Sequence, residues 1–239
     1  MLTDTSAVVL KAVRYSDTNC IVHTYTERFG STSYLVSRSS GRKSGGLRAL
    51  FLPLSVVQIT TDHRPNKDIQ RIREASILHT PMRPSVDPIA NAIALFVAEL
   101  LDRILRSSDC DPQLFAFVTD EIRRMEDVDA RSMASFHLYF LGALSWRLGI
   151  MPDVEGYRRG DVLCCEEGRF RPAVGRHETE RSEVSYLLHK MLTMPRQEGL
   201  VIDRNGRNKL LALLLQYFDH HFPGVSQLKS PRILQELFT

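Results

Sequence analysis

The segment Thr80-Pro-Met-Arg-Pro-Ser-Val-Asp-Pro88 separates two parts of the chain that have different sequence patterns. Before it, residues rich in Val, Ile, Thr, Tyr and Phe are broken at short intervals by turn residues, which is typical of strands. After it, apolar residues recur at helical spacing. Because proline restricts the backbone and favours linkers, we expect one domain over residues 1–80 and a second over residues 81–239.

Five strand-like runs occupy the first part, and we place them at residues 6–15, 19–27, 31–38, 48–60 and 68–78. So many short strands in so few residues predict a small closed or partly closed barrel of the oligonucleotide/oligosaccharide-binding (OB) type. The first run is apolar on both faces, as expected for a strand that lines a barrel and also packs against a second layer. Pro53, inside the fourth run, indicates an edge position or an irregularity.

Helices are expected to begin at Asp87-Pro88 and Asp111-Pro112, because Asp is a favourable N-cap and Pro suits the first helical position. Further helical patterns cover residues 131–148, 180–194, 205–222 and 231–238. Between them, residues 150–178 lose the helical period and contain several glycines, which predicts an irregular excursion or hairpin. The sequence therefore predicts an α+β protein, with a five-stranded OB-type barrel followed by an all-helical domain that carries a small irregular insertion.

The composition of the chain is that of an ordinary globular protein of 239 residues. It has no run of about 18 apolar residues and no cationic N-terminus followed by an apolar stretch, so we expect neither a membrane span nor a signal peptide. The four cysteines do not form the spaced framework of a secreted disulfide protein. We therefore expect a cytoplasmic protein with reduced thiols.

The most basic stretch is a loop, Ser37-Arg-Ser-Ser-Gly-Arg-Lys-Ser-Gly-Gly-Leu-Arg48, which contains no carboxylate. Its cations and backbone amides are suited to phosphate. Residues 1–80 carry 11 Lys and Arg against 6 Asp and Glu, whereas residues 81–202 carry 15 against 19. This segregation indicates a module that faces a polyanion, although a loop of this kind can also be a solvated surface hairpin.

Binding of single-stranded nucleic acid requires cations that follow the phosphates and aromatic faces on which bases stack. Within the predicted barrel we expect an exposed ring at Tyr34 or Phe29, and we select Tyr34. A second basic surface at the start of the long C-terminal helix would allow two strands to be neutralised at once. The expected DNA-binding residues are Arg14, Tyr34, Arg38, Arg42, Lys43, Arg48, Arg71, Arg73, Arg204, Arg207 and Lys209.

No cofactor, metal or catalytic residue is predicted. The chain has neither a Walker-type loop nor a strand-linked GxGxxG, and no spacing supports a catalytic triad or a carboxylate pair. Cys164-Cys165 with His177 and His189 invites a zinc hypothesis, but adjacent cysteines do not reproduce the CxxC spacing that turns two thiolates toward one metal. His220-His221 lie side by side on a helix and point about 100° apart. We therefore expect a protein that is not an enzyme.

Several segments resemble the bacterial RecO recombination-mediator family in order and spacing. These segments are Val8–Lys11, Arg14–Thr18, Thr26–Gly30, the basic loop through Leu52-Pro53, Arg147–Pro152 and Tyr217–Leu234 with its Leu228-Lys229-Ser230. The resemblance implies an N-terminal OB domain, binding of single- and double-stranded DNA, and annealing of complementary strands. It also implies partnership with RecR and the single-stranded DNA-binding protein to load RecA, and a location on the nucleoid.

One departure from the family pattern concerns zinc. Many members carry a four-cysteine zinc module after the Leu-Gly…Pro turn, whereas here the first CxxC is absent and Cys164-Cys165 remains. The resemblance then implies a variant without zinc.

Two other functions stay open on the residues alone. One is an interaction adaptor whose basic loop docks an acidic partner, and the other is a metal-dependent nucleic-acid enzyme, disfavoured because no carboxylate cluster lies near the basic stretch.

Overall fold

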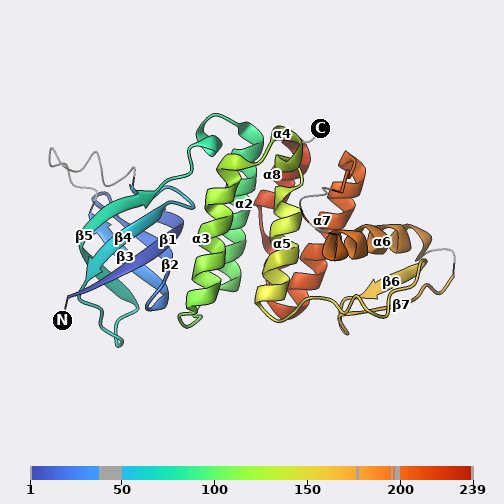
Figure 1. The fold of residues 1–239 in the computed structure, drawn as a ribbon. Coiled ribbons are helices and arrows are strands. Elements are labelled where there is room, and N and C mark those ends of the chain that lie inside the picture. Colours follow the sequence, from blue (N-terminus) through green and yellow to red (C-terminus); the bar gives the residue numbers. More distant parts are fainter. Residues whose placement is uncertain (1, 38–49, 176–177, 195, 197–199, 238–239) are drawn as a thin grey trace. The chain divides into compact units, whose positions relative to one another are not determined.

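The computed structural model describes residues 2–37, 50–175, 178–194, 196 and 200–237 (Figure 1). By internal contacts the chain divides into two compact units, Met1–Val128 and Asp129–Thr239. The first unit therefore contains the first five strands and the first two long helices. The division at residue 80, which is based on sequence pattern, stays a prediction.

The strands of the first unit are β1 (Thr3–Arg14), β2 (Asn19–Thr26), β3 (Gly30–Ser37), β4 (Val56–Thr61) and β5 (Ile69–His79). They form a closed barrel in the order β1-β2-β3-β5-β4. All neighbours are antiparallel except β3 and β5, which pair in parallel. The predicted OB-type barrel is confirmed.

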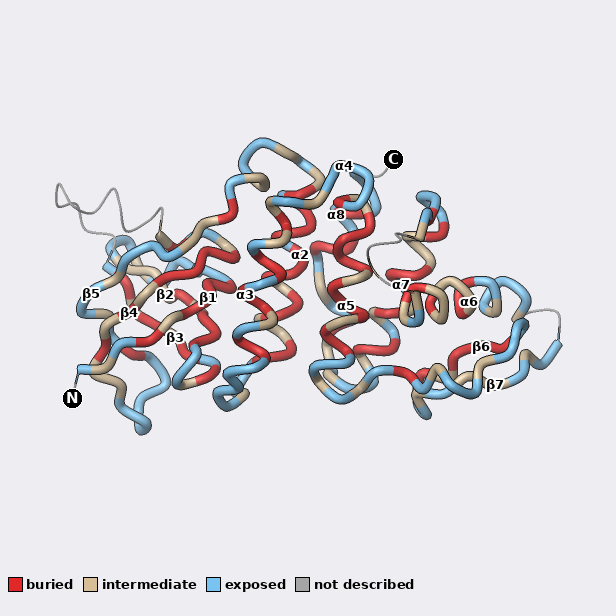
Figure 2. The backbone as a smooth tube through the Cα atoms, in the orientation of Figure 1, coloured by how far each residue is buried: buried red, intermediate tan, exposed pale blue. Residues whose placement is uncertain are grey.

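The barrel core explains why the first strand is apolar on both faces. Ala7 and Val9 lie in the core inside the barrel, and a bulge shifts the register of β1 between Val9 and Lys11. Val8 and Leu10, on the alternating positions, are also buried, and β1 contacts helix α2 (Pro88–Ile104) of the same unit. Figure 2 shows this unbroken burial along the middle of β1. The strand thus has an inner layer and an outer layer of apolar contacts.

The fourth strand is shorter than predicted, because β4 begins at Val56 rather than at residue 48. Pro53 lies in a turn between Phe51 and Ser55, and Leu54 adopts a positive φ of 64° while fully buried. The Leu54 backbone N–H donates to the Val9 carbonyl at 2.8 Å. The irregularity that Pro53 indicates is therefore present, and it packs against β1 next to the bulge.

Helix α2 follows a short 3-10 turn, η1 (Arg83–Ser85), and precedes α3 (Pro112–Asp127). Both helices start as the sequence predicts. The Asp87 carboxylate accepts from the Ile89 and Ala90 amides, and the Asp111 carboxylate accepts from the Gln113 and Leu114 amides. These caps satisfy amides that a helix leaves without partners at its first turn.

Two sets of contacts fix these helices to the barrel. The His23 Nδ1 on β2 lies 3.0 Å from Asp102 Oδ1 on α2. At the β2–β3 turn, the Ser31 amide donates to the Ser108 carbonyl at 3.0 Å, and the Tyr25 hydroxyl accepts from the Asp111 amide at 3.2 Å. The loop between α2 and α3 is thus part of the barrel's packing.

The second unit contains α4 (Ala130–Met133), α5 (Phe136–Arg147), α6 (Thr179–Thr193), α7 (Arg204–His221), a 3-10 turn η4 (Val225–Gln227) and α8 (Ser230–Leu237). The helix predicted over residues 131–148 is interrupted at Ala134-Ser135, and it ends where Gly149 takes a φ of +69°. Residues 150–178 contain the expected hairpin, β6 (Asp161–Cys164) paired with β7 (Arg169–Pro172). Helix α6 packs against β6 and α7.

Candidate nucleic-acid interface

The outer face of the barrel carries a row of side chains that crosses four strands. Val13, Ile21, Leu35 and Arg71 are register partners on β1, β2, β3 and β5. The adjacent residues Val22 and Tyr34 belong to the barrel core, so this row faces outward because side chains alternate along a strand. With strands about 4.8 Å apart the row extends about 14 Å. It presents apolar groups beside one cation.

Arg71 and Arg73 are both exposed on β5. The β4–β5 register shifts between Thr60 and Thr61, which pair with Glu74 and Ile72 and leave Arg73 as the extra residue of a bulge. Bulges redirect side chains at the rims of barrels. The two arginines that the sequence predicts for DNA contact therefore lie on the solvent side of the barrel.

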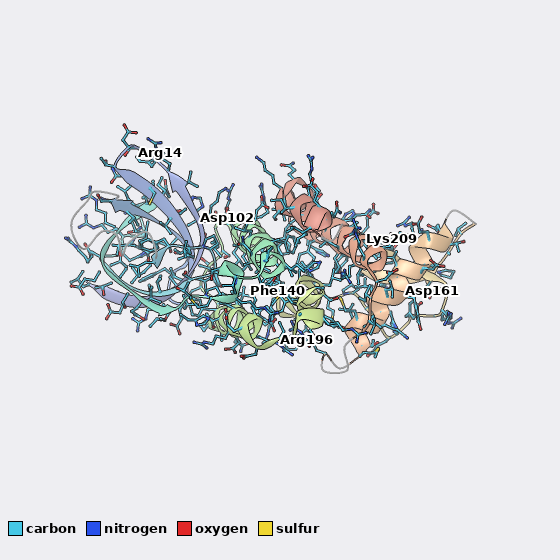
Figure 3. All side chains as sticks on the ribbon, turned by 90° about the horizontal axis from the view of Figure 1, so that it is seen from above. Arg14, Asp102, Phe140, Asp161, Arg196 and Lys209 are labelled. Carbon is cyan, nitrogen blue, oxygen red and sulfur yellow. The ribbon has the colours of Figure 1, made fainter. Side chains whose placement is uncertain are left out.

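The turn between β1 and β2 holds another predicted cation. Arg14 ends β1 and forms an ion pair with Asp17 inside the turn, and Figure 3 shows it at the end of that strand. Both side chains are largely exposed, so the pair is screened by solvent and can open for a phosphate. Tyr15 follows directly and is 65% exposed. The turn thus offers a cation and an uncovered aromatic ring side by side.

Tyr34 does not supply that ring, and the expectation that its ring is exposed is wrong. It is fully buried in the barrel core, and burial raises the pKa of its hydroxyl far above the usual range. The alternation of β3 directs it inward between two outward-facing residues, Ser33 and Leu35. Phe29, the other candidate ring, is stacked on His63 with centroids 4.0 Å apart.

The cations of the basic loop lie outside the described residues. These are Arg38, Arg42, Lys43 and Arg48.

The loop between β4 and β5 belongs to the described part of the barrel. The buried side chain of Gln70 organises it, because the Gln70 side-chain amide donates to the Arg64 and Lys67 carbonyls at 2.8 and 2.6 Å.

The three cations predicted on α7 have different environments. Arg204 is exposed at the first position of the helix. Arg207 is half-buried and donates to the Ile202 carbonyl at 2.8 Å, and burial lowers the pKa of its guanidinium. Lys209, labelled in Figure 3, lies 2.6 Å from the Glu180 carboxylate on α6. One of the three charges is thus already neutralised within the protein.

Lys209 and Glu180 also line a groove of about 320 Å³ between α6, α7 and β6. Its apolar lining residues include Leu163, Val184 and Leu213. On this side α7 therefore presents polar and apolar side chains together rather than a continuous basic stripe.

The described residues among those considered for zinc do not converge on one point. Among the described residues, no three His, Cys, Asp or Glu side chains lie close enough to hold a metal ion. Cys165 is buried, and burial raises the pKa of its thiol. His189 is stacked on Tyr157 with centroids 4.2 Å apart, and His177 lies outside the described residues.

Comparison with known proteins then places the chain. The family model described as "Recombination protein O N terminal" matches residues 1–81, and "Recombination protein O C terminal" matches residues 85–232. The chain belongs to the RecO family. Relatives named "DNA repair protein RecO" are 35% identical in Porphyromonas gingivalis over 247 residues and 35% identical in Phocaeicola vulgatus over 244 residues. In both comparisons all of this chain and all of the relative are covered.

The RecO N-terminal match coincides with the five-stranded barrel, and the RecO C-terminal match begins before α2. The resemblance inferred from short motifs is therefore confirmed along nearly the whole chain.

Of the helices in the described part, none combines the length and apolar character that crossing a bilayer requires.

Proposed function

We propose that this chain is a mediator of DNA repair and homologous recombination that binds single- and double-stranded DNA through the phosphate backbone. The observation that carries the proposal is the outward face of the barrel. There the exposed Arg71 ends the row that begins at Val13, Arg73 is exposed on the same strand, and Arg14 adjoins the uncovered ring of Tyr15. Cations with an exposed aromatic ring suit a single strand of any base sequence.

The proposed activity is the annealing of complementary strands. Annealing breaks and makes no covalent bond, so it requires charge neutralisation and alignment rather than a general acid or a nucleophile. Membership of the RecO family supports further partners. With RecR, the protein would help to load RecA onto DNA covered by the single-stranded DNA-binding protein, and it would act in the cytoplasm on the nucleoid.

The test is a fluorescence anisotropy titration of labelled single-stranded oligonucleotides of two unrelated sequences at several salt concentrations. We expect both sequences to bind equally and the logarithm of the affinity to fall linearly with the logarithm of the salt concentration. Arg71→Ala with Arg73→Ala should weaken binding to both and reduce the slope by about 0.7 for each phosphate that the variant no longer neutralises.

A parallel variant removes the charges of Arg42, Lys43 and Arg48. If the loop contacts DNA, it too should flatten the salt dependence, whereas an unchanged slope would remove the loop from the binding surface. Absence of DNA binding by the unmodified protein at low salt would overturn the proposal and favour an adaptor that docks an acidic protein.

A further inference from the structure

Two cations converge on one tyrosine in the second unit, and none of the three is a residue that the sequence predicts for DNA. The Arg159 guanidinium carbon and the Lys190 Nζ each lie 5.0 Å from the centre of the Tyr186 ring. A hydrogen bond from Lys190, together with the charges of Lys190 and Arg159, lowers the pKa of the Tyr186 hydroxyl. The three side chains therefore form one compact cluster.

The neighbouring structure holds this cluster in place. Tyr157, two residues before Arg159, stacks on His189, which is next to Lys190 on α6. Phe170 of β7 packs edge-on against both rings, with centroids 5.0 Å from Tyr157 and 6.2 Å from His189. The turn before β6, which carries Arg159, is thus fixed to the helix that carries Tyr186 and Lys190.

A second contact fixes the backbone beside Arg159. The Arg158 amide donates to the Asp161 carboxylate at 2.8 Å, and the Asp161 amide donates to the Arg158 carbonyl at 2.9 Å. The buried Asp161 carboxylate thus accepts a hydrogen bond within the turn itself. A preorganised pair of cations loses less entropy on binding an anion than two mobile ones.

Neither cation of the cluster is neutralised within the described residues. Arg159 and Lys190 take part in none of the ion pairs found there, in contrast to Lys209, whose charge meets Glu180. Arg159 is also exposed. With no carboxylate paired to either cation among the described residues, the positive potential around the ring favours an anionic ligand.

We propose that Arg159, Tyr186 and Lys190 form a second binding site for single-stranded DNA, in which the two cations contact phosphate oxygens and the aromatic and guanidinium planes contact a base. The inference rests on the proposed function, because it supplies the second strand-binding surface that annealing requires. The site belongs to the turn before β6 and to α6, and not to the start of α7.

Single-stranded DNA fits this cluster better than an acidic peptide does. The cluster offers planar groups beside the charges, and such planes stack on bases. A carboxylate-rich peptide uses the charges alone. The groove whose apolar lining residues could hold side chains of a peptide lies around Val184 and Leu213, and it includes none of the three residues of the cluster.

The test compares the full-length protein with the double variant Arg159→Ala/Lys190→Ala. Anisotropy with a labelled single strand measures the salt slope, which is the slope of the logarithm of the affinity against the logarithm of the salt concentration. The double variant should reduce this slope by about 1.4, because two phosphates are no longer neutralised and each contributes about 0.7. The matched control is Arg123→Ala/Arg232→Ala, which removes two exposed arginines that are paired with Asp120 and Glu236. The control should keep the slope of the unmodified protein.

The exchange Arg159→Lys/Lys190→Arg keeps both charges. It therefore shows whether a reduced salt slope comes from lost charge or from damage to the fold, and it should retain most of the salt slope of the unmodified protein. A direct signal comes from Tyr186→Trp combined with Trp146→Phe, which moves the single tryptophan of the chain into the site. Base stacking should quench its fluorescence on addition of the single strand.

The outcomes distinguish the two proposals. If the unmodified protein binds no DNA, the proposed function fails. If it binds DNA but the Arg159→Ala/Lys190→Ala slope is unchanged and the tryptophan is not quenched, the barrel surface stands and this site is overturned. Binding of polyglutamate that depends on Arg159 and Lys190, without such a dependence for DNA, would also overturn it and would assign the cluster to an acidic protein.

Discussion

Gly30 lies directly against the backbone of Ser108, so that the turn between β2 and β3 and the loop between α2 and α3 touch main chain to main chain. Gly30 has a φ of +65°, and a β-carbon there would overlap the Ser108 carbonyl oxygen and approach the Cys110 nitrogen to 2.7 Å. The Ser31 amide donates to the same Ser108 carbonyl. Only glycine permits this approach, and the approach docks the helices on the barrel.

Gly30→Ala should therefore destabilise the first unit. A left-handed backbone costs alanine roughly 1 kcal/mol, and the overlap forces backbone atoms apart, so we expect a loss of at least about 2 kcal/mol. Urea unfolding measures it. The control is Gly156→Ala, since a β-carbon at Gly156 meets no atom within 4 Å. Equal unfolding midpoints for the two variants would show that the loop is not fixed at this point.

Asp102 should make the stability of the first unit depend on acid pH. Burial alone would raise the pKa of its carboxyl, but the hydrogen bond with His23 and the positive charges of His23, Lys11 and Arg106 outweigh burial and lower the pKa below the usual 3.8. A lowered folded-state pKa gives stability that is present above 3.8 and is lost as pH falls through the folded-state value.

The difference in unfolding free energy between the unmodified protein and Asp102→Asn should thus be fully present near pH 5 and should shrink below about pH 4. Chemical unfolding at a series of pH values measures this difference. Asp120→Asn, on the exposed face of α3, serves as the control for general charge effects. A difference for Asp102→Asn that does not change with pH would mean that the His23 contact does not stabilise the carboxylate.

The sequence predicts the fold well where the signals are local. Asp-Pro pairs start α2 and α3 at the expected residues, and turn residues separate most of the strands. The fourth strand is misplaced because Phe51–Ser55 is as apolar as a strand but forms a turn around Pro53 and Leu54. Composition cannot distinguish a buried turn from a buried strand, since both need apolar side chains.

The candidate site is harder to predict, because exposure depends on register and on partners far away in sequence. Tyr34 and Leu35 are both apolar enough for either face of β3, and their orientation follows from pairing with β2 and β5. The charge of Lys209 meets Glu180 only when α6 and α7 pack together. Likewise, Arg159 and Tyr186 are 27 positions apart, so no local pattern brings them together.

Tyr34 should matter for stability and not for DNA. Its hydroxyl is buried without a hydrogen-bond partner among the described residues, so Tyr34→Phe removes a polar group that is costly to bury and should not lower stability. Tyr34→Ala should cost about 3 to 5 kcal/mol, as for other large core side chains. Urea unfolding and anisotropy together test this. A loss of DNA affinity in Tyr34→Phe with unchanged stability would contradict the buried position.

Tyr15 should behave in the opposite way. Because its ring is exposed beside Arg14, Tyr15→Ala should leave the unfolding midpoint unchanged while weakening single-strand binding by about 1 to 3 kcal/mol, the usual value of one stacked base. Tyr15→Phe keeps the ring and should retain the affinity. Anisotropy at fixed salt gives the comparison, and equal affinities for the alanine variant and the unmodified protein would exclude stacking at this turn.

Glu180 controls how much of the positive charge on α7 is available. The hydrogen bond from Lys209 lowers the pKa of the Glu180 carboxyl, so the pair stays ionised near neutral pH and the lysine charge is offset. If the start of α7 contacts DNA, Glu180→Gln should release Lys209, strengthen binding at low salt and steepen the salt slope by up to about 0.7.

The double variant Glu180→Gln/Lys209→Ala should lose this gain, because the released cation is then absent. Glu236→Gln removes a carboxylate from a comparable ion pair on α8, with Arg232, and measures the effect of net charge alone. An increase for Glu180→Gln that persists without Lys209, or that Glu236→Gln matches, would mean that long-range charge rather than contact by Lys209 accounts for it. Lys209 would then be a structural partner of α6 and no part of the DNA surface.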